Sequence, residues 1–185
     1  MTTSIVGHKA DMCVLALGPD LQVLRRLQTE LAQAGLEVAD SYFSLTEVSE
    51  YAAGAPEEMR LARLYPKLPP AEKPAFCFYP MSKRRAPGAE NWYTLPYERR
   101  LELMYGHGGV GRKFRGRVLQ LVTGSTGVDD YEWGVTLFAV QMDDLKECVY
   151  TMRFDEASAL YAEFGSFYTG LVGEPEAVLR EIGVE

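Results

Sequence analysis

The chain has 185 residues, of which 47% are apolar and 24% are charged, and its formal net charge is −7. This composition is typical of a globular protein and excludes disordered and fibrous chains. The longest apolar run, Met12–Leu17, is too short to cross a membrane, and the polar start contains no basic segment followed by an apolar core. We therefore expect a cytoplasmic protein without a membrane partner.

The cysteines and histidines restrict the kinds of metal site that the chain can build. Its three cysteines are scattered and form no Cys-x-x-Cys pair, which argues against a disulfide framework or a zinc ribbon. The two histidines, His8 and His107, cannot build a site that needs several imidazoles. A metal centre with one protein ligand, such as a haem iron, remains possible.

The first part of the chain predicts a strand, a helix, a second strand and a linker. An apolar segment bounded by turn residues predicts a buried strand at 8–18, and leucines at helical spacing predict an amphipathic helix at 20–35. Imperfect alternation at 37–51 suggests a strand that returns antiparallel to the first. The proline-rich segment 52–74, with a short helix at 56–64, is typical of a linker between two halves.

The second part of the chain predicts a complete structural unit. In chain order its elements are a strand at 75–83, a helix from Pro96 to a glycine-rich end, strands at 118–123 and 132–140, helices at 143–153 and 155–164, and a strand at 166–172. This order is the ferredoxin-like βαββαβ unit, so we expect an α+β fold of antiparallel sheets with helices packed outside. Residues 75–185 form its C-terminal half, and residues 1–74 form an incomplete N-terminal half.

The strand at the start of the second half carries a polar face. A period of two puts Phe76 and Phe78 on one side of this strand. Tyr79, Met81 and Lys83 lie on the opposite side. One face can therefore pack in the core while the other borders a pocket.

The segment Lys83–Arg117 is a basic island in an acidic chain. It contains nine cations and three acids, a net charge of +6, which leaves −13 for the rest of the chain. A localised cluster of cations indicates a localised anionic ligand rather than non-specific binding of polyanions.

Glycines surround one of the two histidines. Gly106, Gly108 and Gly111 match the Gly-x-Gly-x-x-Gly pattern of dinucleotide sites, but that pattern should follow a strand and open a helix. Here it closes a predicted helix and precedes a strand. We interpret the glycines as a relaxed helix end that presents His107 to a cavity, the alternative being an ordinary hydrogen-bonded histidine.

Aromatic and cationic residues interleave between Phe78 and Tyr93, as they do in platforms that bind single-stranded nucleic acid. No RNA-binding motif accompanies them, and the net charge of the chain is negative. Nucleic acid is therefore the weakest of the candidate partners.

Seven ordered segments resemble one known family. They are YPMSKRR from Tyr79, NWY from Asn91, HG-x-x-GR from His107, Gln120, TGS from Thr123, EW from Glu132, and MRFDEASALYAEFGSFYTG from Met152. Together they resemble the chlorite dismutase-like family, and within it the coproheme decarboxylases, which are hydrogen peroxide-dependent haem synthases. The resemblance extends from His8 to Val172.

The resemblance implies a subunit of two ferredoxin-like halves, assembled into a homopentamer, with an iron porphyrin in the C-terminal half. The implied reaction in haem biosynthesis is the oxidative decarboxylation of two propionates of iron coproporphyrin III (coproheme) by hydrogen peroxide, which yields haem b. Iron coproporphyrin III is then both substrate and redox centre. The alternative is a haem-binding or haem-transfer protein of the same family without this turnover.

The resemblance also implies roles for the residues that could carry out the reaction. His107 matches the proximal iron ligand of the family. Tyr79 matches the tyrosine that forms a radical, and Lys83 matches the lysine beside it.

Further positions match the porphyrin pocket of the family. Met81 and Ser158 match positions around the propionates, and either Arg63 or Arg60 is the arginine that binds a propionate. Gln120 matches the glutamine on the distal face. Chlorite dismutases have an arginine there that stabilises an oxyanion, so the resemblance implies that chlorite is a poor substrate.

The first half of family members normally opens with a strand and a helix that this chain lacks. Two explanations remain open, which are a start codon assigned downstream of the true one and a shortened subunit.

Overall fold

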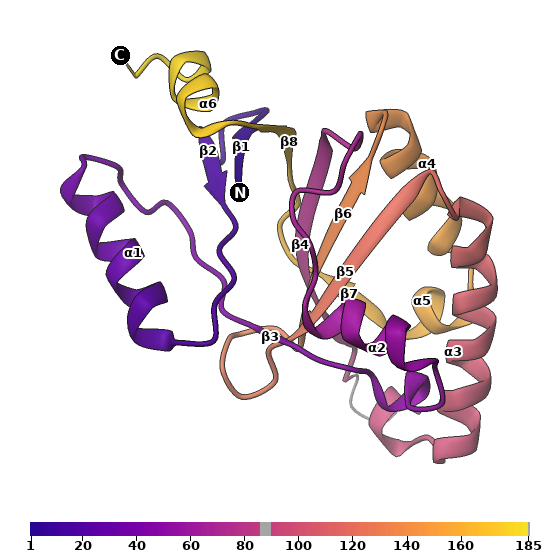
Figure 1. Cartoon of the computed structure of the whole chain (residues 1–185). Coiled ribbons are helices and arrows are strands. Elements are labelled where there is room, and N and C mark those ends of the chain that lie inside the picture. The colour runs from indigo at the N-terminus through magenta and orange to yellow at the C-terminus, as the bar shows by residue number, and fades with distance from the viewer. Residues whose placement is uncertain (86–89, 185) are drawn as a thin grey trace.

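The computed structural model describes residues 1–85 and 90–184. The elements are β1 (Thr2–Ile5), β2 (Met12–Val14), α1 (Leu21–Gln33), β3 (Leu45–Thr46), η1 (Glu50–Ala52), α2 (Glu57–Leu64), β4 (Ala75–Lys83), η2 (Trp92–Thr94), α3 (Tyr97–Gly111), η3 (Arg112–Phe114), β5 (Val118–Gly124), β6 (Trp133–Ala139), α4 (Met142–Met152), α5 (Glu156–Tyr161), β7 (Ala162–Phe164), β8 (Tyr168–Gly173) and α6 (Pro175–Glu181). The described strands form an antiparallel sheet in the order β2-β1-β8-β4-β6-β5-β3, with β7 paired to β4 (Figure 1).

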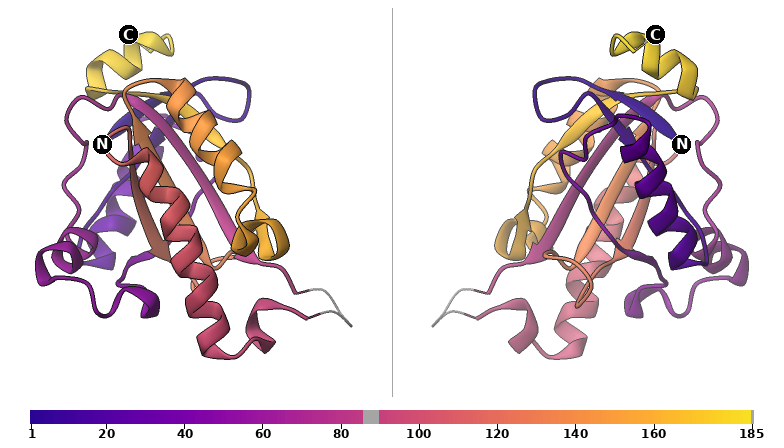
Figure 2. Two further views of the ribbon diagram at one scale, coloured as in Figure 1. Left: turned by 90° about the vertical axis from the view of Figure 1, so that its right-hand side faces the viewer. Right: turned by 90° about the vertical axis from the view of Figure 1, so that its left-hand side faces the viewer.

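The second half of the chain forms the predicted ferredoxin-like unit. Its strands lie in the order β8-β4-β6-β5, and each neighbouring pair is antiparallel. The helices α3 and α4 lie on one side of the sheet, while α1 lies on the other (Figure 2). The predicted α+β fold class is confirmed, and the positions of β4, α3, β5 and β6 agree with the sequence-based prediction to within about three residues at either end.

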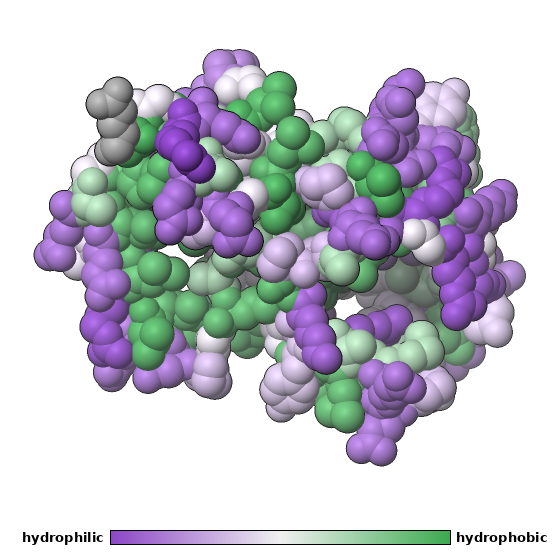
Figure 3. All heavy atoms as spheres, turned by 45° about the horizontal axis from the view of Figure 1, so that its top comes forward, coloured by the Kyte–Doolittle hydropathy of each residue, from purple (hydrophilic) through white to green (hydrophobic). Residues whose placement is uncertain are grey.

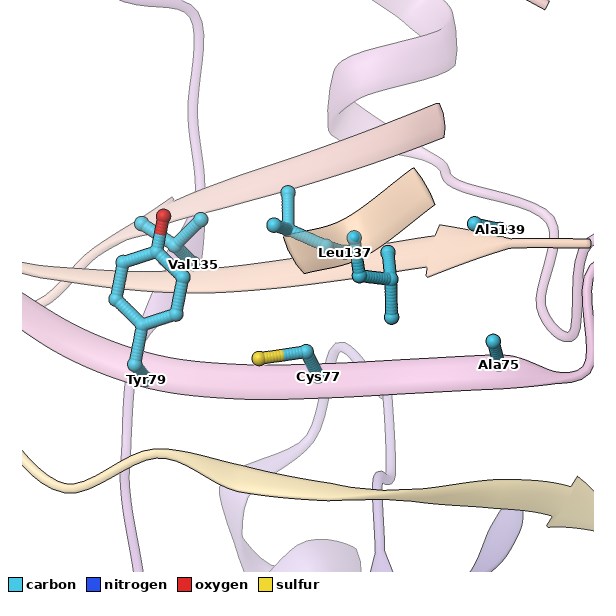
Figure 4. Packing of buried hydrophobic residues seen from close by; sticks show 7 residues of the cluster. Ala75, Cys77, Tyr79, Val135, Leu137 and Ala139 are labelled. Atoms are coloured by element: carbon cyan, nitrogen blue, oxygen red, sulfur yellow. The ribbon is translucent and has the colours of Figure 1, made fainter. Parts of the chain in front are cut away.

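The alternation along β4 builds a core on each face of the sheet. On one face, Phe76 packs against Phe138 of β6 with ring centroids 5.8 Å apart. On the other face, β4, β6 and α4 bury a second cluster (Figure 4). Its members are Ala75, Cys77, Tyr79, Val135, Leu137, Ala139 and Leu145. Removing these apolar side chains from water stabilises the packing of α4 on the sheet.

The strand register extends this second face to β5. Cys77 lies opposite Leu137, which in turn lies opposite Gln120. In the same way Tyr79 aligns through Val135 with Val122. Because side chains aligned across a sheet share one face, Gln120 and Val122 point to the side that carries α3 and α4.

Two expectations for the first part of the chain are corrected. The strand predicted at 8–18 shortens to the three residues of β2, which pairs with the unpredicted strand β1. The segment 37–51 does not return along the first strand, because its short strand β3 pairs with β5 instead.

Side chains explain this second correction. The backbone N–H of Phe43 donates to the carboxylate of Asp129 at 2.7 Å, and Ser44 and Thr123 share a hydrogen bond between their hydroxyl groups at 2.7 Å. The segment before β3 is therefore held to β5 and to the turn after it by side chains, which compensate for its weak strand pattern.

The helix α1 forms as predicted but stands apart from the sheet (Figure 1). Asp20 caps it by accepting a hydrogen bond from the N–H of Gln22 at 2.8 Å, and Gly35 follows its end with a φ of +92°, which favours glycine. No residue of α1 is fully buried. On the side of the molecule where α1 lies, hydrophilic residues line the outer edge and apolar residues lie inside it (Figure 3).

Towards its C-terminus the chain departs from the prediction at two places. The helix expected to reach residue 164 stops at Tyr161, because Ala162–Phe164 pair as β7 with the end of β4. The unpredicted helix α6 packs against β1 and buries Val178. None of the described helices has the length and apolar character needed to span a membrane.

Candidate active site

The glycine-rich segment around His107 forms the last turns of α3, which ends there as predicted. The helix continues through Gly111, although each glycine costs a helix interior about 1 kcal/mol relative to alanine. Packing holds it in place, since Leu103 of α3 is buried against Trp92, Ala157 and Tyr161.

The surface of α3 beside His107 is open. Apart from the adjacent residues and the nearby backbone of α3, a Cβ atom built on Gly106 or Gly111 would meet no described atom within 4 Å. A flat ligand could therefore approach the helix closely at this point.

His107 is held by the N-terminus of α5. Its Nδ1 lies 3.1 Å from Oδ2 of Asp155, and the hydroxyl of Ser158 donates to the same oxygen at 2.7 Å. The side chain of Asp155 is only 5% exposed, and its other oxygen caps α5 by accepting from the N–H of Ser158. A carboxylate beside Nδ1 favours the tautomer that carries its proton there, which leaves Nε2 free to bind a metal.

Tyr79 lies in the apolar cluster between β4 and α4, as Figure 4 shows. Its ring stacks on Phe167 with centroids 4.5 Å apart and meets Phe164 edge to face. Burial raises the pKa of this phenol well above its usual range. Tyr79 therefore keeps its proton at neutral pH and can lose that proton together with an electron.

Lys83 lies on the same face of β4 but turns toward α5. Its Nζ donates to the carbonyl of Ala157 at 3.1 Å and lies 4.2 Å from the centre of the Trp92 ring. Burial lowers the pKa of Lys83 to about 8, although the carboxylates of Asp155 and Glu132 partly offset this effect. The amine can consequently take up or release a proton near neutral pH.

Gln120 and Val122 form an exposed stretch of β5 on the side of the sheet where α3 lies. In the described part of the chain, α3 packs mainly against α4 and α5 rather than against β5. This exposed stretch of β5 and the helix of His107 therefore lie on the same side of the sheet. No cationic residue occurs in β5.

The remaining predicted residues are only partly brought together. Met81 is half-buried on β4 opposite Trp133, and Ser158 contacts His107 through Asp155. Arg63 is exposed on α2, and no hydrogen bond or ion pair of the described residues joins it to this group. Arg60 lines a hollow of about 460 Å³ between η1 and α2.

Part of the basic island is neutralised within the chain. Each of four arginines is paired with at least one carboxylate. The pairs are Arg85 with Glu132, Arg99 with Glu102 and Glu156, Arg100 with Glu50, and Arg117 with Asp144 and Glu147.

Sequence reasoning missed three residues of the site. Asp155 was expected only as a helix cap, because the spacing of Asp155 and Ser158 is the signal of an N-terminus and says nothing of His107. Glu132 and Trp92 lay within motifs but had no role. In the structure each of them contacts Lys83.

A histidine that is hydrogen-bonded to a buried carboxylate can serve as the one protein ligand of a metal or a metalloporphyrin. The class is thus a ferredoxin-like α+β protein with a candidate single-histidine site, and the free Nε2 and the open glycine surface are compatible with a flat iron porphyrin. A family model described as chlorite dismutase matches residues 1–173. The chain belongs to the chlorite dismutase family.

Solved structures agree with this assignment. A novel heme-binding protein from Thermus thermophilus is 40% identical, with a TM-score of 0.90 over 99% of this chain and 75% of the other. Chlorite dismutase from Candidatus Nitrospira defluvii in complex with imidazole is 17% identical, with a TM-score of 0.72 over 98% of this chain and 76% of the other. At this identity the second similarity concerns the fold alone.

Proposed function

We propose that this protein is a coproheme decarboxylase, which uses hydrogen peroxide to convert two propionates of iron coproporphyrin III to vinyl groups and so yields haem b. The observation that carries the proposal is the pairing of His107 with the buried Asp155 beside an open helix surface. The similarity to a heme-binding protein at 40% identity supports it.

The residues of the site divide into a holding group and a reacting group. His107 would bind the iron through Nε2, with Asp155 and Ser158 orienting its ring. Met81 and Ser158 would border the propionates, and Arg63 or Arg60 on α2 would pair with one of them. Charge-assisted hydrogen bonds of this kind contribute roughly 1.5–3 kcal/mol each.

Tyr79 and Lys83 would carry out the chemistry. The bound iron porphyrin, together with peroxide, supplies the oxidising power. Tyr79 would give up its electron and proton and then, as a radical, take a hydrogen atom from the β-carbon of a propionate. Loss of carbon dioxide and of one further electron leaves a vinyl group. Lys83, with a pKa of about 8, would accept the phenol proton or balance the charge of the propionate.

The exposed face of β5 supports this activity over cleavage of chlorite. Gln120 is neutral and β5 contains no cation, so this strand has no fixed positive charge to stabilise an oxyanion. A glutamine can still offer a hydrogen bond to peroxide.

A second candidate is haem binding or haem transfer without turnover, which the similarity to the heme-binding protein from Thermus thermophilus favours. To separate the two, the protein is loaded with ferric coproporphyrin III, titrated with peroxide, and its porphyrins are analysed by chromatography and mass spectrometry. Stepwise loss of two carboxyl groups supports decarboxylation. Binding without any conversion, at peroxide levels that do not bleach the porphyrin, would reject it.

We further infer that the protein assembles into a homo-oligomer, with a homopentamer as the form that family resemblance implies. Large apolar side chains at the surface support an assembly, among them Leu21 and Val23 of α1 and Leu171 of β8.

A further inference from the structure

Glu132 is a buried carboxylate to which the proposed reaction gives no role. It immediately precedes β6 and is only 8% exposed. Its Oε2 accepts a hydrogen bond from the backbone N–H of Lys83 at 2.8 Å, and its Oε1 pairs with the guanidinium of Arg85 at 2.5 Å. Both contacts are made to the end of β4 that carries Lys83.

The backbone of Glu132 is fixed as well. Its N–H donates to the carbonyl of Met81 at 3.1 Å, and its carbonyl accepts from the N–H of Ser125 at 2.8 Å. With backbone and carboxylate both held, the side chain has little freedom to move away from β4. A buried charge held in this way strongly influences the charged groups around it.

Lys83 is a buried titratable group that this charge influences. Its ammonium is enclosed by the Trp92 ring and the Ala157 carbonyl. Glu132 faces it from the start of β6 and Asp155 from the N-terminus of α5, while the guanidinium of Arg85 pairs with Glu132.

We propose that Glu132 is the positioning residue for Lys83, fixing the strand end that carries this lysine and favouring its protonated form by its negative charge. The consequence for catalysis rests on the proposed function, but the effect on Lys83 itself does not. Tyr93 also senses this carboxylate, because burial and then a hydrogen bond to Glu132 raise its pKa to about 12.

Two substitutions should move the pKa of Lys83 in opposite directions. Glu132→Gln keeps an oxygen that can accept from the Lys83 N–H but removes the charge, so the protonated amine loses a stabilising partner. Its titration midpoint should fall by about one pH unit, a usual size for loss of a nearby opposite charge. Arg85→Gln leaves Glu132 without its cation, so the midpoint should rise.

The test is an NMR titration of the lysine Cε signals of the ¹³C-labelled protein without porphyrin, with the signal of Lys83 identified by its loss in Lys83→Arg. Glu147→Gln is the matched control, because it removes the same charge from the exposed pair with Arg117. The control should leave the midpoint of Lys83 unchanged. Arg85 is 65% exposed, so Arg85→Gln provides the test if Glu132→Gln does not fold.

An unchanged midpoint in Glu132→Gln, or an equal change in Glu147→Gln, overturns the proposal. If Glu132→Gln does not fold, a midpoint that fails to rise in Arg85→Gln overturns it. When the same variants are assayed with coproheme and peroxide, the limb of the pH–rate profile that Lys83 controls should move with its midpoint. A shifted midpoint in a protein that never decarboxylates coproheme rejects the proposed function and still supports the role of Glu132.

Discussion

His107 is the residue whose replacement has the most direct spectroscopic readout. His107→Ala removes the imidazole beside the open glycines of α3, so ferric coproporphyrin should lose its histidine-ligated absorbance and electron paramagnetic resonance spectra. His8→Ala is the matched control, because His8 is exposed near the N-terminus. A histidine signature that persists in His107→Ala and vanishes in His8→Ala would reverse the assignment.

Tyr79 should be needed for the reaction but not for binding. Tyr79→Phe removes only the hydroxyl, and its stacking on Phe167 can remain. Coproheme affinity should therefore change less than about threefold, while decarboxylation of the first propionate falls by at least about 100-fold. Tyr65→Phe serves as a control, since Tyr65 is exposed. Conversion near the parental rate under limiting peroxide would make Tyr79 a structural residue.

Lys83 should destabilise the folded protein at neutral pH. Its pKa of about 8 lies below the value of about 10.4 for lysine in an unfolded chain. Between these two pKa values the unfolded chain binds more protons than the folded chain, so the stability of the fold rises with pH through this window. Below pH 8 the loss of stability caused by Lys83 is complete. Lys83→Met should raise Tm at pH 7, and the gain should shrink toward pH 10. Exposed Lys113→Met is the control, and a gain independent of pH would contradict the explanation.

At the scale of elements, α5 depends on Asp155 for its cap and His107 depends on it for orientation. Asp155→Asn keeps a good capping residue but removes the charge, so Tm should change little while the iron–histidine stretching frequency of the ferrous protein falls. Asp155→Ala should lower both, with a loss of stability of about 1 kcal/mol. Differential scanning calorimetry and resonance Raman spectroscopy measure the two effects. Equal frequencies in the parent and Asp155→Asn would mean that the carboxylate does not act on the imidazole.

The sequence predicted the elements that bury an apolar face. It did not predict the pairing of strands where that pairing depends on side chains from distant parts of the chain. β4, α3, β5 and β6 carry long periodic patterns, so their positions follow from spacing alone. The pairing of β3 with β5 depends on Asp129 and Thr123, which lie far along the chain from the segment they hold. No local pattern contains that information.

The candidate site likewise has a part that the sequence predicts and a part that only the structure shows. The common face of Tyr79, Met81 and Lys83 follows from the period of a strand. The contact between His107 and Asp155 joins residues 48 positions apart, and it exists only once α3 packs against α5. Resemblance to known sequences predicted His107 as the iron ligand. The residue that orients its ring, Asp155, is identified only by the structure.

At the scale of the whole molecule, the apolar side chains left at the surface predict self-association. Light scattering coupled to size-exclusion chromatography should therefore give a mass several times the 20.7 kDa of one chain, with five copies expected from the family. Replacing Leu21 and Val23 of α1 with Glu should shift the distribution toward smaller species if α1 lies at an interface. A monomer at all concentrations for the unaltered protein would contradict the expectation.

The helix α5 and its cap contact both His107 and Lys83. Asp155 holds the imidazole, and two positions later the carbonyl of Ala157 receives the ammonium of Lys83. The short helix therefore couples these two positions, because a rotation or an inserted residue there displaces His107 and Lys83 together. A substitution meant to change the surroundings of only one of these residues is therefore better made in α3 or β4 than in α5.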